Sequence, residues 1–501
     1  MAGPVFIHKN KLGADIKAKG KEKEQRGCST GTQSLNIGMG TSCGAELKLL
    51  MAATLVLCTL FTSLRLIAYR SCDIPSVSLS PLISISIATG DRERLDEGVV
   101  VRAFKSYGAA AYSFITMGTY RGGPSTFAVV ALSSKPLQVY SRPTYLCRWI
   151  SPRANGTSIY ATGLKILPDW GYGRVYTVVV VNCSFAVPVN LDSGGGSLIL
   201  MTSSAGGGDK ERNVTETVEV LREEEGVDVM MALGSAPKYD YLYCGSPLYG
   251  QLSPQRVREW IAYHVRLMGE RSHFVMFDAG GMHTEIRDVL KPWMELGYVT
   301  LHDIRSQERF DGYYHNQFLV VNDCLHRYKL QTKWMFFFDL DEYIYVLPGN
   351  TLRSVFDSFK NFSQVTIEQM PMSSSLCLTG DYGQYYRKWG IEKLVYRDVQ
   401  RGKRRDRKYA VQPRNVYATG VHLSQNLAGS TTHRTEKKIK YFHYHGTIAQ
   451  RREPCRQLYN ETEVVFEGIP YLLDTTLRNL AWSVKKFEHN IIGSQLQTTR
   501  Q

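Results

Sequence analysis

Three carboxylates follow a buried run of aromatic residues in the stretch W-M-F-F-F-D-L-D-E-Y-I-Y-V, residues 334–346. In an extended chain Asp339 and Asp341 lie on one side, about 7 Å apart, and a turn brings them closer. Two such carboxylates repel each other unless a cation lies between them. Hard oxygen ligands with open positions suit Mg²⁺ or Mn²⁺. The pattern predicts a metal site that binds a diphosphate; an acidic turn between two strands is the alternative.

The segments before this stretch alternate between strand and helix patterns. Residues 238–244, 273–278, 298–303 and 334–338 read as strands, and the segments between them have helical periods. The first helix is marked by Ser253 as N-cap, Pro254 at its first turn and Gly269 past its end. The alternation predicts an α/β fold with a parallel sheet. Ligands bind at the carboxyl ends of such strands, where Asp278, Asp303 and the Asp339 cluster lie.

The amino-terminal half has a different pattern. Short apolar strands broken by Gly and Pro run from about residue 97 to 200, which predicts a β-sandwich module over 97–212. The Gly- and Ser-rich residues 192–212 predict a flexible loop or linker. Residues 213–495 then form the predicted catalytic domain.

An apolar segment near the amino terminus predicts a membrane anchor. Residues 49–64 carry no charge, and the segment reaches residue 69 if Arg65 extends to the membrane surface. A cleaved signal peptide is the alternative, but 48 residues precede the segment, far more than a signal peptide has. Lysines in that leading part favour a single-pass type II orientation, with residues 1–48 a cytosolic tail and 70–96 a stem.

Composition indicates a globular protein, and two further features agree with a lumenal location of its bulk. The chain has 501 residues, of which 43% are hydrophobic, and a net charge of +14. Glycosylation sequons and widely spaced cysteines, the latter able to form disulfides of undetermined pairing, follow the anchor segment. The sequons are Asn155, Asn182, Asn213, Asn361 and Asn460, and the cysteines are Cys147, Cys183, Cys244, Cys324, Cys377 and Cys455. No zinc-finger spacing, RNA-binding motif or basic heptad is present, so nucleic acid is not an expected partner.

An ordered set of motifs resembles glycosyltransferase family 92, and within it the plant β-1,4-galactan synthases. The motifs are C-G-S-P-L-Y-G (244–250), R-E-W-I-A-Y-H (258–264), H-F-V-M-F-D (273–278), N-D-C-L-H-R-Y (322–328), K-W-M-F-F-F-D-L-D-E-Y-I-Y (333–345) and K-Y-F-H-Y-H-G (440–446). Further likeness in T-Y-R-G-G-P-S-T-F-A-V (119–129), S-S-K-P-L (133–137) and L-P-D-W-G-Y-G-R-V-Y (167–176) extends it over about 100–485.

This resemblance implies a GT-A fold and inverting, Mn²⁺- or Mg²⁺-dependent transfer of galactose from UDP-galactose. The acceptor would be the non-reducing end of β-1,4-galactan, a side chain of the pectin rhamnogalacturonan I, in the Golgi membrane. The β module would bind carbohydrate. Alternatives are a transferase of the same fold that uses another sugar, such as UDP-arabinopyranose, and a non-catalytic glycan-binding membrane protein. A homodimer is left open.

The resemblance also implies roles for individual residues. Asp341 would bind the metal, Asp339 would bind metal or ribose, and Glu342 would support them. A carboxy-terminal histidine often completes such sites, which gives His443 or His445, with His443 preferred; either is otherwise a structural histidine. Nucleotide contacts would come from Cys244, Ser246, Tyr249, Asp278, Asn316 and Gln317, although Asp278 reads equally as a turn residue.

An inverting transfer also needs a carboxylate that deprotonates the acceptor hydroxyl. Glu368 and Asp381 are the candidates, and neither matches a motif of the family. The rings of Tyr382, Tyr385, Tyr386 and Trp389 are candidates for stacking on acceptor sugars, or are core residues.

Overall fold

The structure is a computed structural model, and all of its described residues belong to one compact unit within 84–501. It describes residues 93–96, 99–102, 105–107, 114–134, 143–153, 158–167, 176–203, 215–306, 310, 313–401 and 405–496. The predicted tail and anchor, most of the predicted stem, and the sequons at Asn155 and Asn213 lie outside this part of the chain. Within the described residues, no helix combines the length and apolar character that crossing a membrane requires.

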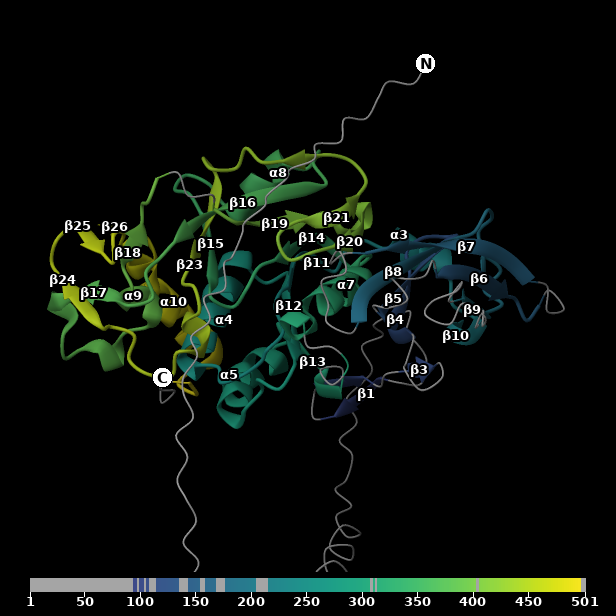
Figure 1. Cartoon of the computed structure of the whole chain (residues 1–501), viewed down its shortest axis with the longest axis horizontal. Coiled ribbons are helices and arrows are strands. Elements are labelled where there is room, and N and C mark those ends of the chain that lie inside the picture. The colour runs from purple at the N-terminus through teal and green to yellow at the C-terminus, as the bar shows by residue number, and fades with distance from the viewer. Residues whose placement is uncertain are drawn as a thin grey trace, which may run out of the picture. The chain divides into compact units, whose positions relative to one another are not determined.

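An eleven-stranded mixed sheet forms the centre of the carboxy-terminal part (Figure 1). Its strands run in the order β1-β2-β13-β12-β11-β14-β19-β16-β23-β15, with β22 beside β16. They are β1 (Glu93–Asp96), β2 (Val99–Arg102), β11 (Tyr239–Cys244), β12 (Ser272–Asp278), β13 (Val299–Asp303), β14 (Thr332–Phe337), β15 (Glu342–Val346), β16 (Gln364–Pro371), β19 (Arg407–Val411), β22 (Thr431–Thr432) and β23 (Ile439–His443).

The predicted parallel sheet is confirmed. Strands β13, β12, β11 and β14 pair in parallel, and the helices α4 (Pro254–Met268), α5 (Thr284–Glu295) and α7 (Gln317–Tyr328) connect them. The Ser253 side chain accepts from the Arg256 amide, Pro254 opens α4, and Gly269 ends it, as the sequence predicts. The chemistry-bearing residues therefore reach one edge of the sheet, where these strands end.

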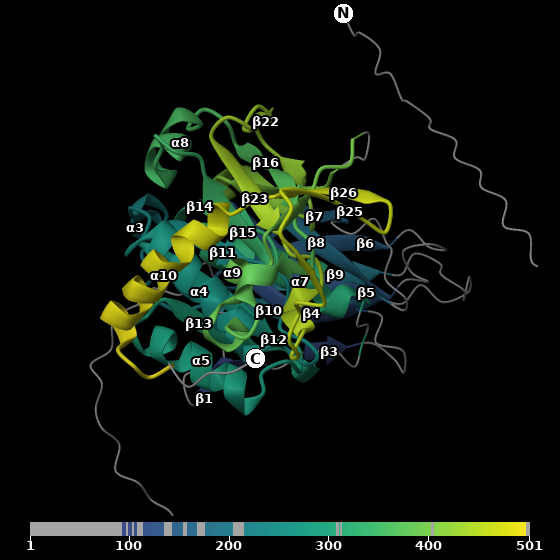
Figure 2. The same cartoon turned by 90° about the vertical axis from the view of Figure 1, so that its left-hand side faces the viewer.

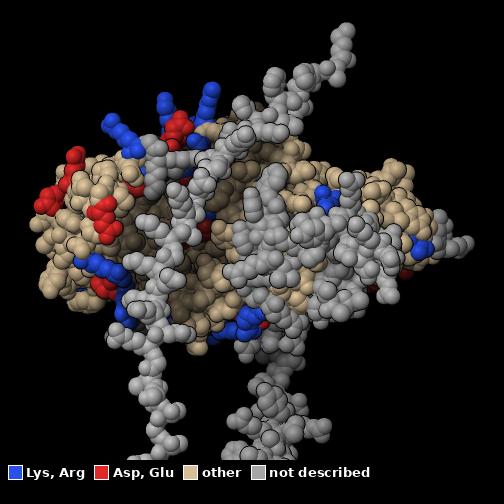
Figure 3. Space-filling view, viewed as in Figure 1, with Lys and Arg blue, Asp and Glu red and all other residues tan. Residues whose placement is uncertain are grey.

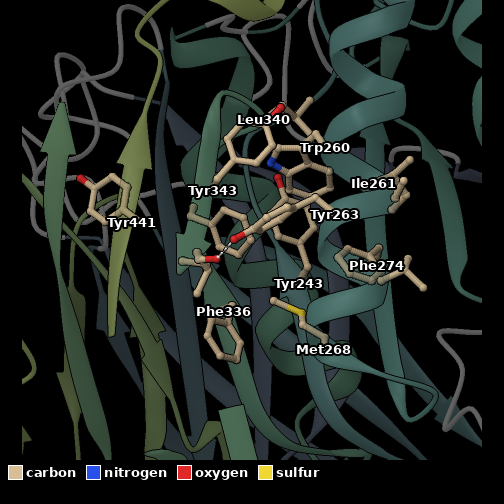
Figure 4. Packing of buried hydrophobic residues seen from close by; sticks show 14 of the residues in the cluster. Tyr243, Trp260, Ile261, Tyr263, Met268, Phe274, Phe336, Leu340, Tyr343 and Tyr441 are labelled. Carbon is tan, nitrogen blue, oxygen red and sulfur yellow. Dashed lines mark hydrogen bonds between the residues drawn. The ribbon is translucent and has the colours of Figure 1, made fainter. Parts of the chain in front are cut away.

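Helix α4 packs on the sheet through a dense aromatic cluster (Figure 4). Trp260 and Tyr263 are buried; the indole nitrogen donates to the carbonyl of Glu342 at 2.9 Å, and the Tyr263 hydroxyl donates to that of Ile344 at 2.8 Å. Between them His264 bridges Trp260 and Ile344, with Nδ1 2.9 Å from the Trp260 carbonyl and Nε2 3.2 Å from the Ile344 amide. The strand that follows the acidic stretch is thus anchored to α4.

The remaining elements complete the carboxy-terminal part, where α10 packs beside α4 (Figure 2). The helices are α3 (Val229–Gly234), α8 (Leu352–Ser358), α9 (Gly390–Lys393) and α10 (Thr476–Ile492), with short 3₁₀ turns η1 (Tyr313–Asn316), η2 (Thr379–Asp381), η3 (Tyr385–Arg387), η4 (Pro413–Asn415) and η5 (Thr447–Ala449). The strands of the small sheets are β17 (Leu376–Leu378), β18 (Tyr396–Asp398), β20 (Val416–Thr419), β21 (Ser424–Leu427), β24 (Gln457–Tyr459), β25 (Glu463–Phe466) and β26 (Ile469–Leu473).

The amino-terminal strands form one eight-stranded antiparallel sheet, whereas a sandwich of two sheets was expected. Its order is β10-β9-β6-β7-β8-β5-β4-β3. The strands are β3 (Lys105–Tyr107), β4 (Phe114–Arg121), β5 (Thr126–Ser134), β6 (Thr144–Ile150), β7 (Ser158–Ile166), β8 (Tyr176–Ser184), β9 (Gly196–Ser203) and β10 (Thr215–Glu223). The sheet curls so that β10 contacts β4, and the buried side chains of Arg121 and Glu223 form an ion pair across that closure.

The two sheets share a hydrophobic core. Ile115, Val130 and Val180 of the eight-stranded sheet pack in the same cluster as Leu319 and Val320 of α7 and as the central strands. Asp323 and Arg327 of α7 also hydrogen-bond the hydroxyl of Tyr120. The boundary expected at residue 97 differs too, because β2 pairs in parallel with β13 of the larger sheet. The amino-terminal sheet is therefore integral to the molecule.

Part of the predicted linker is ordered structure. Within 192–212, the Gly195 amide donates to the Asn190 side chain at 2.8 Å, and residues 196–203 form strand β9. Residues 204–214 lie outside the described part. The prediction of disulfides is confirmed, and the pairs are Cys147–Cys183, Cys244–Cys324 and Cys377–Cys455. On the face drawn in Figure 3, basic and acidic side chains form small groups, several of them side by side, and most of the described surface is neither.

Candidate active site

The acidic stretch forms a tight turn between β14 and β15. The Glu342 amide donates to the Asp339 carbonyl at 3.2 Å, and the Asp339 amide donates to Oε2 of Glu342 at 2.7 Å. Glu342 is buried and thus closes the turn from inside. Gly245, just after β11, lies so close that an added Cβ would be 2.1 Å from the Phe338 carbonyl oxygen. The close approach of the two strand ends therefore requires glycine there.

Asp339 is held by two protein donors. Its Oδ1 accepts from Gln317 Nε2 at 2.9 Å, and its Oδ2 accepts from Lys408 Nζ at 2.6 Å. Burial by itself raises the pKa of Asp339, but the Lys408 ammonium outweighs burial and the net pKa lies below its usual value. Burial raises the pKa of Glu342, the other acidic neighbour of Lys408. Asp339 is therefore the member of this group that is held as a carboxylate.

Asp341 faces a histidine from a neighbouring strand. Strand β23 pairs antiparallel to β15, with His443 in register with Glu342. His443 Nε2 lies 3.6 Å from Asp341 Oδ1, while Asp341 Oδ2 accepts from the Gly446 amide at 2.8 Å. The Tyr444 amide donates to the Asp341 carbonyl at 2.9 Å, so the segment after β23 closes over the aspartate.

The side chain of His443 is a neutral imidazole. Burial, with help from Lys408, lowers the pKa of His443 below its usual value, so the imidazole is neutral at neutral pH. Its Nδ1 contacts the side-chain amide of Gln369. If that amide turns so that its oxygen accepts from Nδ1, the lone pair lies on Nε2, which faces Asp341.

The Asp341–His443 pair fits a divalent cation. Adjacent ligands about 2.1 Å from a metal in octahedral geometry lie roughly 3 Å apart, and opposite ligands about 4 Å apart. The 3.6 Å between His443 Nε2 and Asp341 Oδ1 lies between these values, so a small shift of either side chain would bring both atoms to one ion. Within the described residues, no group of three His, Cys, Asp or Glu side chains is arranged to hold a metal. The site thus offers two ligands, as Mg²⁺ sites do when substrate phosphates and water supply the rest. His445 is exposed, with its ring centre 5.3 Å from that of His443.

The expected role of Cys244 is corrected by the structure. Its sulfur is bonded to Cys324 of α7 and the residue is fully buried, so its side chain is not available to a nucleotide. Ser246 is half-buried in the same segment, and Tyr249 is 43% exposed. Burial and the nearby charges of Asp339 and Asp341 raise the pKa of Tyr249, which places its phenol near the acidic turn.

Gln317 and its neighbours approach the acidic turn from α7. Tyr314, His315 and Asn316 all have left-handed φ values, between 47° and 59°, an unusual run for residues other than glycine. The run brings the His315 ring onto the Tyr249 ring, with centres 3.8 Å apart, and it starts α7 with Gln317 bonded to Asp339. Strain of this kind is characteristic of functional sites.

Asp278 orders a turn, which is the alternative to a nucleotide contact that the sequence also allows. Its Oδ1 accepts from the amides of Gly280 and Met282 at 2.9 and 3.1 Å, which orders the turn after β12. Its Oδ2 lies 3.6 Å from the Arg305 guanidinium. The carboxylate therefore lies at the expected strand end, although turn amides already occupy one of its oxygens.

The structure does not bring the two candidate bases to the Asp341–His443 pair. Glu368 lies on β16, in register with Arg407 of β19. The next residue on β16, Gln369, contacts His443, and neighbouring residues of a strand point to opposite faces, so Glu368 points to the other face of the sheet. Asp381 is buried and bound by Lys388 and Arg478, with Arg478 nitrogens at 2.5 and 2.9 Å. Asp381 therefore holds a turn, beside which Tyr382 and Tyr386 are about three-quarters exposed.

Three contributions were not expected from the sequence: Lys408, Gln369 and the Gly446 amide. Lys408 lies 69 residues beyond Asp339, among several other lysines and arginines. The neighbouring sequence therefore does not distinguish Lys408 from these other basic residues. Gly446 carries no functional side chain, and Gln369 acts through the register of β16 with β23.

Comparisons with known proteins agree with this geometry. The family model of glycosyltransferase family 92 matches residues 239–479, which include the acidic turn and His443. Three similar proteins of Arabidopsis thaliana are galactan beta-1,4-galactosyltransferases. GALS3 is 55% identical over 96% of this chain and 99% of its own length, GALS2 is 61% identical over 80% and 78%, and GALS1 is 50% identical over 79% of each. The chain therefore belongs to glycosyltransferase family 92 and is a glycosyltransferase.

Proposed function

We propose that this chain transfers galactose from UDP-galactose to the non-reducing end of β-1,4-galactan in a metal-dependent reaction. The observation that carries the proposal is the 55% identity, over 96% of this chain, with a protein named as a galactan beta-1,4-galactosyltransferase. The Asp341–His443 pair at the carboxyl edge of the parallel strands supports the dependence on metal.

The residues of the acidic turn divide into those that hold the metal and those that order the turn. Asp341 and His443 would hold Mn²⁺ or Mg²⁺, which when bound neutralises the departing diphosphate. Glu342 fixes the backbone of Asp339, the Gly446 amide fixes the carboxylate of Asp341, and Gln369 orients the imidazole. Tyr249 and His315 present stacked rings beside the turn, on the side where the nucleotide would bind.

The stereochemistry requires a single displacement. Galactose is α-linked in the donor and β-linked in the product, so the acceptor oxygen attacks the anomeric carbon opposite the leaving UDP. The bond from that carbon to the diphosphate oxygen breaks as the new glycosidic bond forms, and the hydroxyl proton passes to a base. Since neither Glu368 nor Asp381 faces the Asp341–His443 pair, the proposal names no base.

The test is an assay of the purified full-length chain with UDP-galactose and a galacto-oligosaccharide. We expect chain extension with Mn²⁺ that chelation abolishes and re-added metal restores. Replacement of UDP-galactose by other UDP-sugars, including UDP-arabinopyranose, establishes the donor. No extension with any donor, combined with retention on galactan, would instead support a non-catalytic glycan-binding protein.

We further propose that residues 49–69 anchor the chain in the Golgi membrane, with the rest in the lumen. Three disulfides, as well as exposed sequons at Asn361 and Asn460, support an oxidising, glycosylating compartment. The variants Asn361→Gln and Asn460→Gln should each lose one glycan, visible as a mobility shift. Unglycosylated wild-type protein would contradict this topology.

We also propose that the eight-stranded sheet binds the glycan. Tyr160 and Leu164 of β7 are 51% and 61% exposed, and the Arg148 guanidinium lies 5.7 Å from the Tyr160 ring centre. A flat exposed ring beside a donor-rich side chain suits a sugar face. Tyr160→Ala should weaken retention on galactan in affinity gels and leave transfer to a short acceptor unchanged; unchanged retention would count against this surface.

A further inference from the structure

The two aspartates of the turn have different surroundings, although they are only two residues apart. Both oxygens of Asp339 are occupied, Oδ1 by Gln317 of α7 and Oδ2 by Lys408 of β19. Its backbone amide is bonded to Glu342. Asp339 is therefore fixed by three groups, from a helix, from a neighbouring strand and from its own turn.

Lys408 is a buried cation in an acidic group. Its side chain is 2% exposed, and its ammonium lies 2.6 Å from Asp339 Oδ2 and 3.6 Å from Glu342 Oε2. A buried ammonium is costly unless an anion lies beside it, and a buried carboxyl group is costly unless its oxygens are hydrogen-bonded or paired. Each member of this group of three thus depends on the others for its position.

No lysine or arginine side chain in the described residues forms an ion pair with Asp341. Its Oδ2 accepts from the neutral amide of Gly446, and its Oδ1 faces the imidazole of His443. Among the carboxylates of the turn, Asp341 is the one that has no ammonium or guanidinium nitrogen of the described residues within ion-pair distance.

We propose that Lys408 is a positioning residue that keeps Asp339 out of metal coordination, so that Asp341 and His443 alone bind the ion. This inference rests on the proposed metal-dependent transfer. With one carboxylate and one imidazole, the protein binds a divalent cation weakly, because affinity for such ions rises with the number of charged ligands. The ion therefore binds tightly only together with the diphosphate of the donor.

The test is direct Mn²⁺ binding to the purified full-length chain, followed by the electron paramagnetic resonance of free Mn²⁺, with and without UDP. In the wild type we expect UDP to tighten Mn²⁺ binding at least tenfold. Lys408→Met frees the Asp339 carboxylate, so Mn²⁺ binding without UDP should tighten about tenfold while the rate of transfer falls. Unchanged or weaker Mn²⁺ binding in folded Lys408→Met would overturn the proposal.

Asp339→Asn tests the same point if Lys408→Met does not fold. Asp339→Asn should keep wild-type Mn²⁺ affinity within about twofold, whereas Asp341→Asn should lose it. An equal loss in both variants would show that Asp339 is a ligand and refute the proposal. The double variant Lys408→Met/Asp339→Asn, which removes both charges, should also bind Mn²⁺ as the wild type does.

Lys333→Met is the matched control. It breaks the 2.7 Å ion pair of Lys333 with Asp240, which lies at the start of β14, whereas the acidic turn follows the end of that strand. The variant should therefore leave Mn²⁺ binding unchanged. These readouts do not depend on which sugar is transferred. If Mn²⁺ binds as expected in all variants but galactan is not extended, only the proposed function is refuted. If the wild type does not bind Mn²⁺ in the presence of UDP, the inference is refuted.

Discussion

His443 Nε2 lies 3.6 Å from Asp341 Oδ1, although the two residues are a hundred positions apart in the sequence. The register of β15 with β23 sets this distance, because it places His443 beside Glu342. One residue of slip between these strands would turn the imidazole to the other face of the sheet. The pairing of two strands thus determines the geometry of the candidate metal site.

The first prediction concerns His443. His443→Ala removes one of the two proposed metal ligands while the turn keeps its backbone hydrogen bonds, so we expect transfer to fall at least a hundredfold, about 2.7 kcal/mol in activation free energy. The Mn²⁺ concentration for half-maximal activity should rise, which a titration of rate against Mn²⁺ measures. His445→Ala is the control and should retain most activity. The reverse order of effects would identify His445 as the ligand.

The second prediction concerns the Cys244–Cys324 disulfide. It closes a loop with a sequence separation of 80 and ties the end of β11 to α7. Replacement of both cysteines by alanine should lower the free energy of unfolding by about 4 kcal/mol. Because α7 carries Gln317, UDP affinity should fall as well; thermal unfolding and UDP titration measure the two effects.

The Cys377–Cys455 disulfide provides the control for that experiment. Its sequence separation is 78, so its removal should cost a similar free energy of unfolding. It joins β17 to the segment before β24, away from α7, so UDP affinity should be retained below the melting temperature. Equal losses of UDP affinity in both variants would argue against a specific role of the Cys244 bridge.

The third prediction concerns the buried ion pair of Arg121 with Glu223. Arg121→Met leaves the Glu223 carboxylate buried without its guanidinium, so the free energy of unfolding should fall by about 3 to 5 kcal/mol. The double variant Arg121→Met/Glu223→Met should recover part of that loss, since no unpaired charge is left. Urea unfolding of the three proteins measures the difference. A double variant less stable than Arg121→Met would contradict this account.

The fourth prediction concerns pH. Burial lowers the pKa of His264 to about 3, whereas in the unfolded chain it is about 6.5. As pH falls below 6.5, the unfolded chain takes up a proton that the folded chain does not, so stability is lost towards pH 3. At pH 5 the loss is about 2 kcal/mol for this histidine. Buried His326, with a pKa of about 3, and His273, with a pKa of about 4, act in the same direction.

Thermal unfolding of His264→Gln at pH 7 and pH 5 tests that argument. The glutamine lowers stability at pH 7, because it replaces the hydrogen bonds to Trp260 and Ile344 imperfectly. The difference between the two pH values should nevertheless shrink, since one titrating group is gone. A pH dependence as steep as that of the wild type would show that His264 is not responsible.

The sequence predicted those features that depend on local pattern. The alternation of strands and helices from Tyr239 to Phe337 follows from hydrophobic period and from caps such as Ser253, so the parallel sheet and its functional edge could be inferred. The family motifs directed attention to Asp339, Asp341 and His443 for the same reason: each lies in a recognisable short stretch.

Features that depend on long-range pairing could not be inferred. The pairing of Cys244 with Cys324 and the engagement of Lys408 with Asp339 are set by how β11, α7 and β19 assemble. Strand patterns show alternation but not which strands become neighbours, so the sequence predicts a sandwich where the structure has a single curled sheet. The ion pair of Asp381 with Arg478 likewise depends on α10, almost a hundred residues later.

Helix α7 contacts two parts of the molecule, the core beneath the eight-stranded sheet and the acidic turn. Its Leu319 and Val320 pack in the core beneath the eight-stranded sheet, while Gln317 at its start donates a hydrogen bond to Asp339 of the acidic turn. A truncated chain that begins after that sheet would expose the apolar side of α7 to solvent. The amino-terminal strands thus support the candidate active site structurally, through α7.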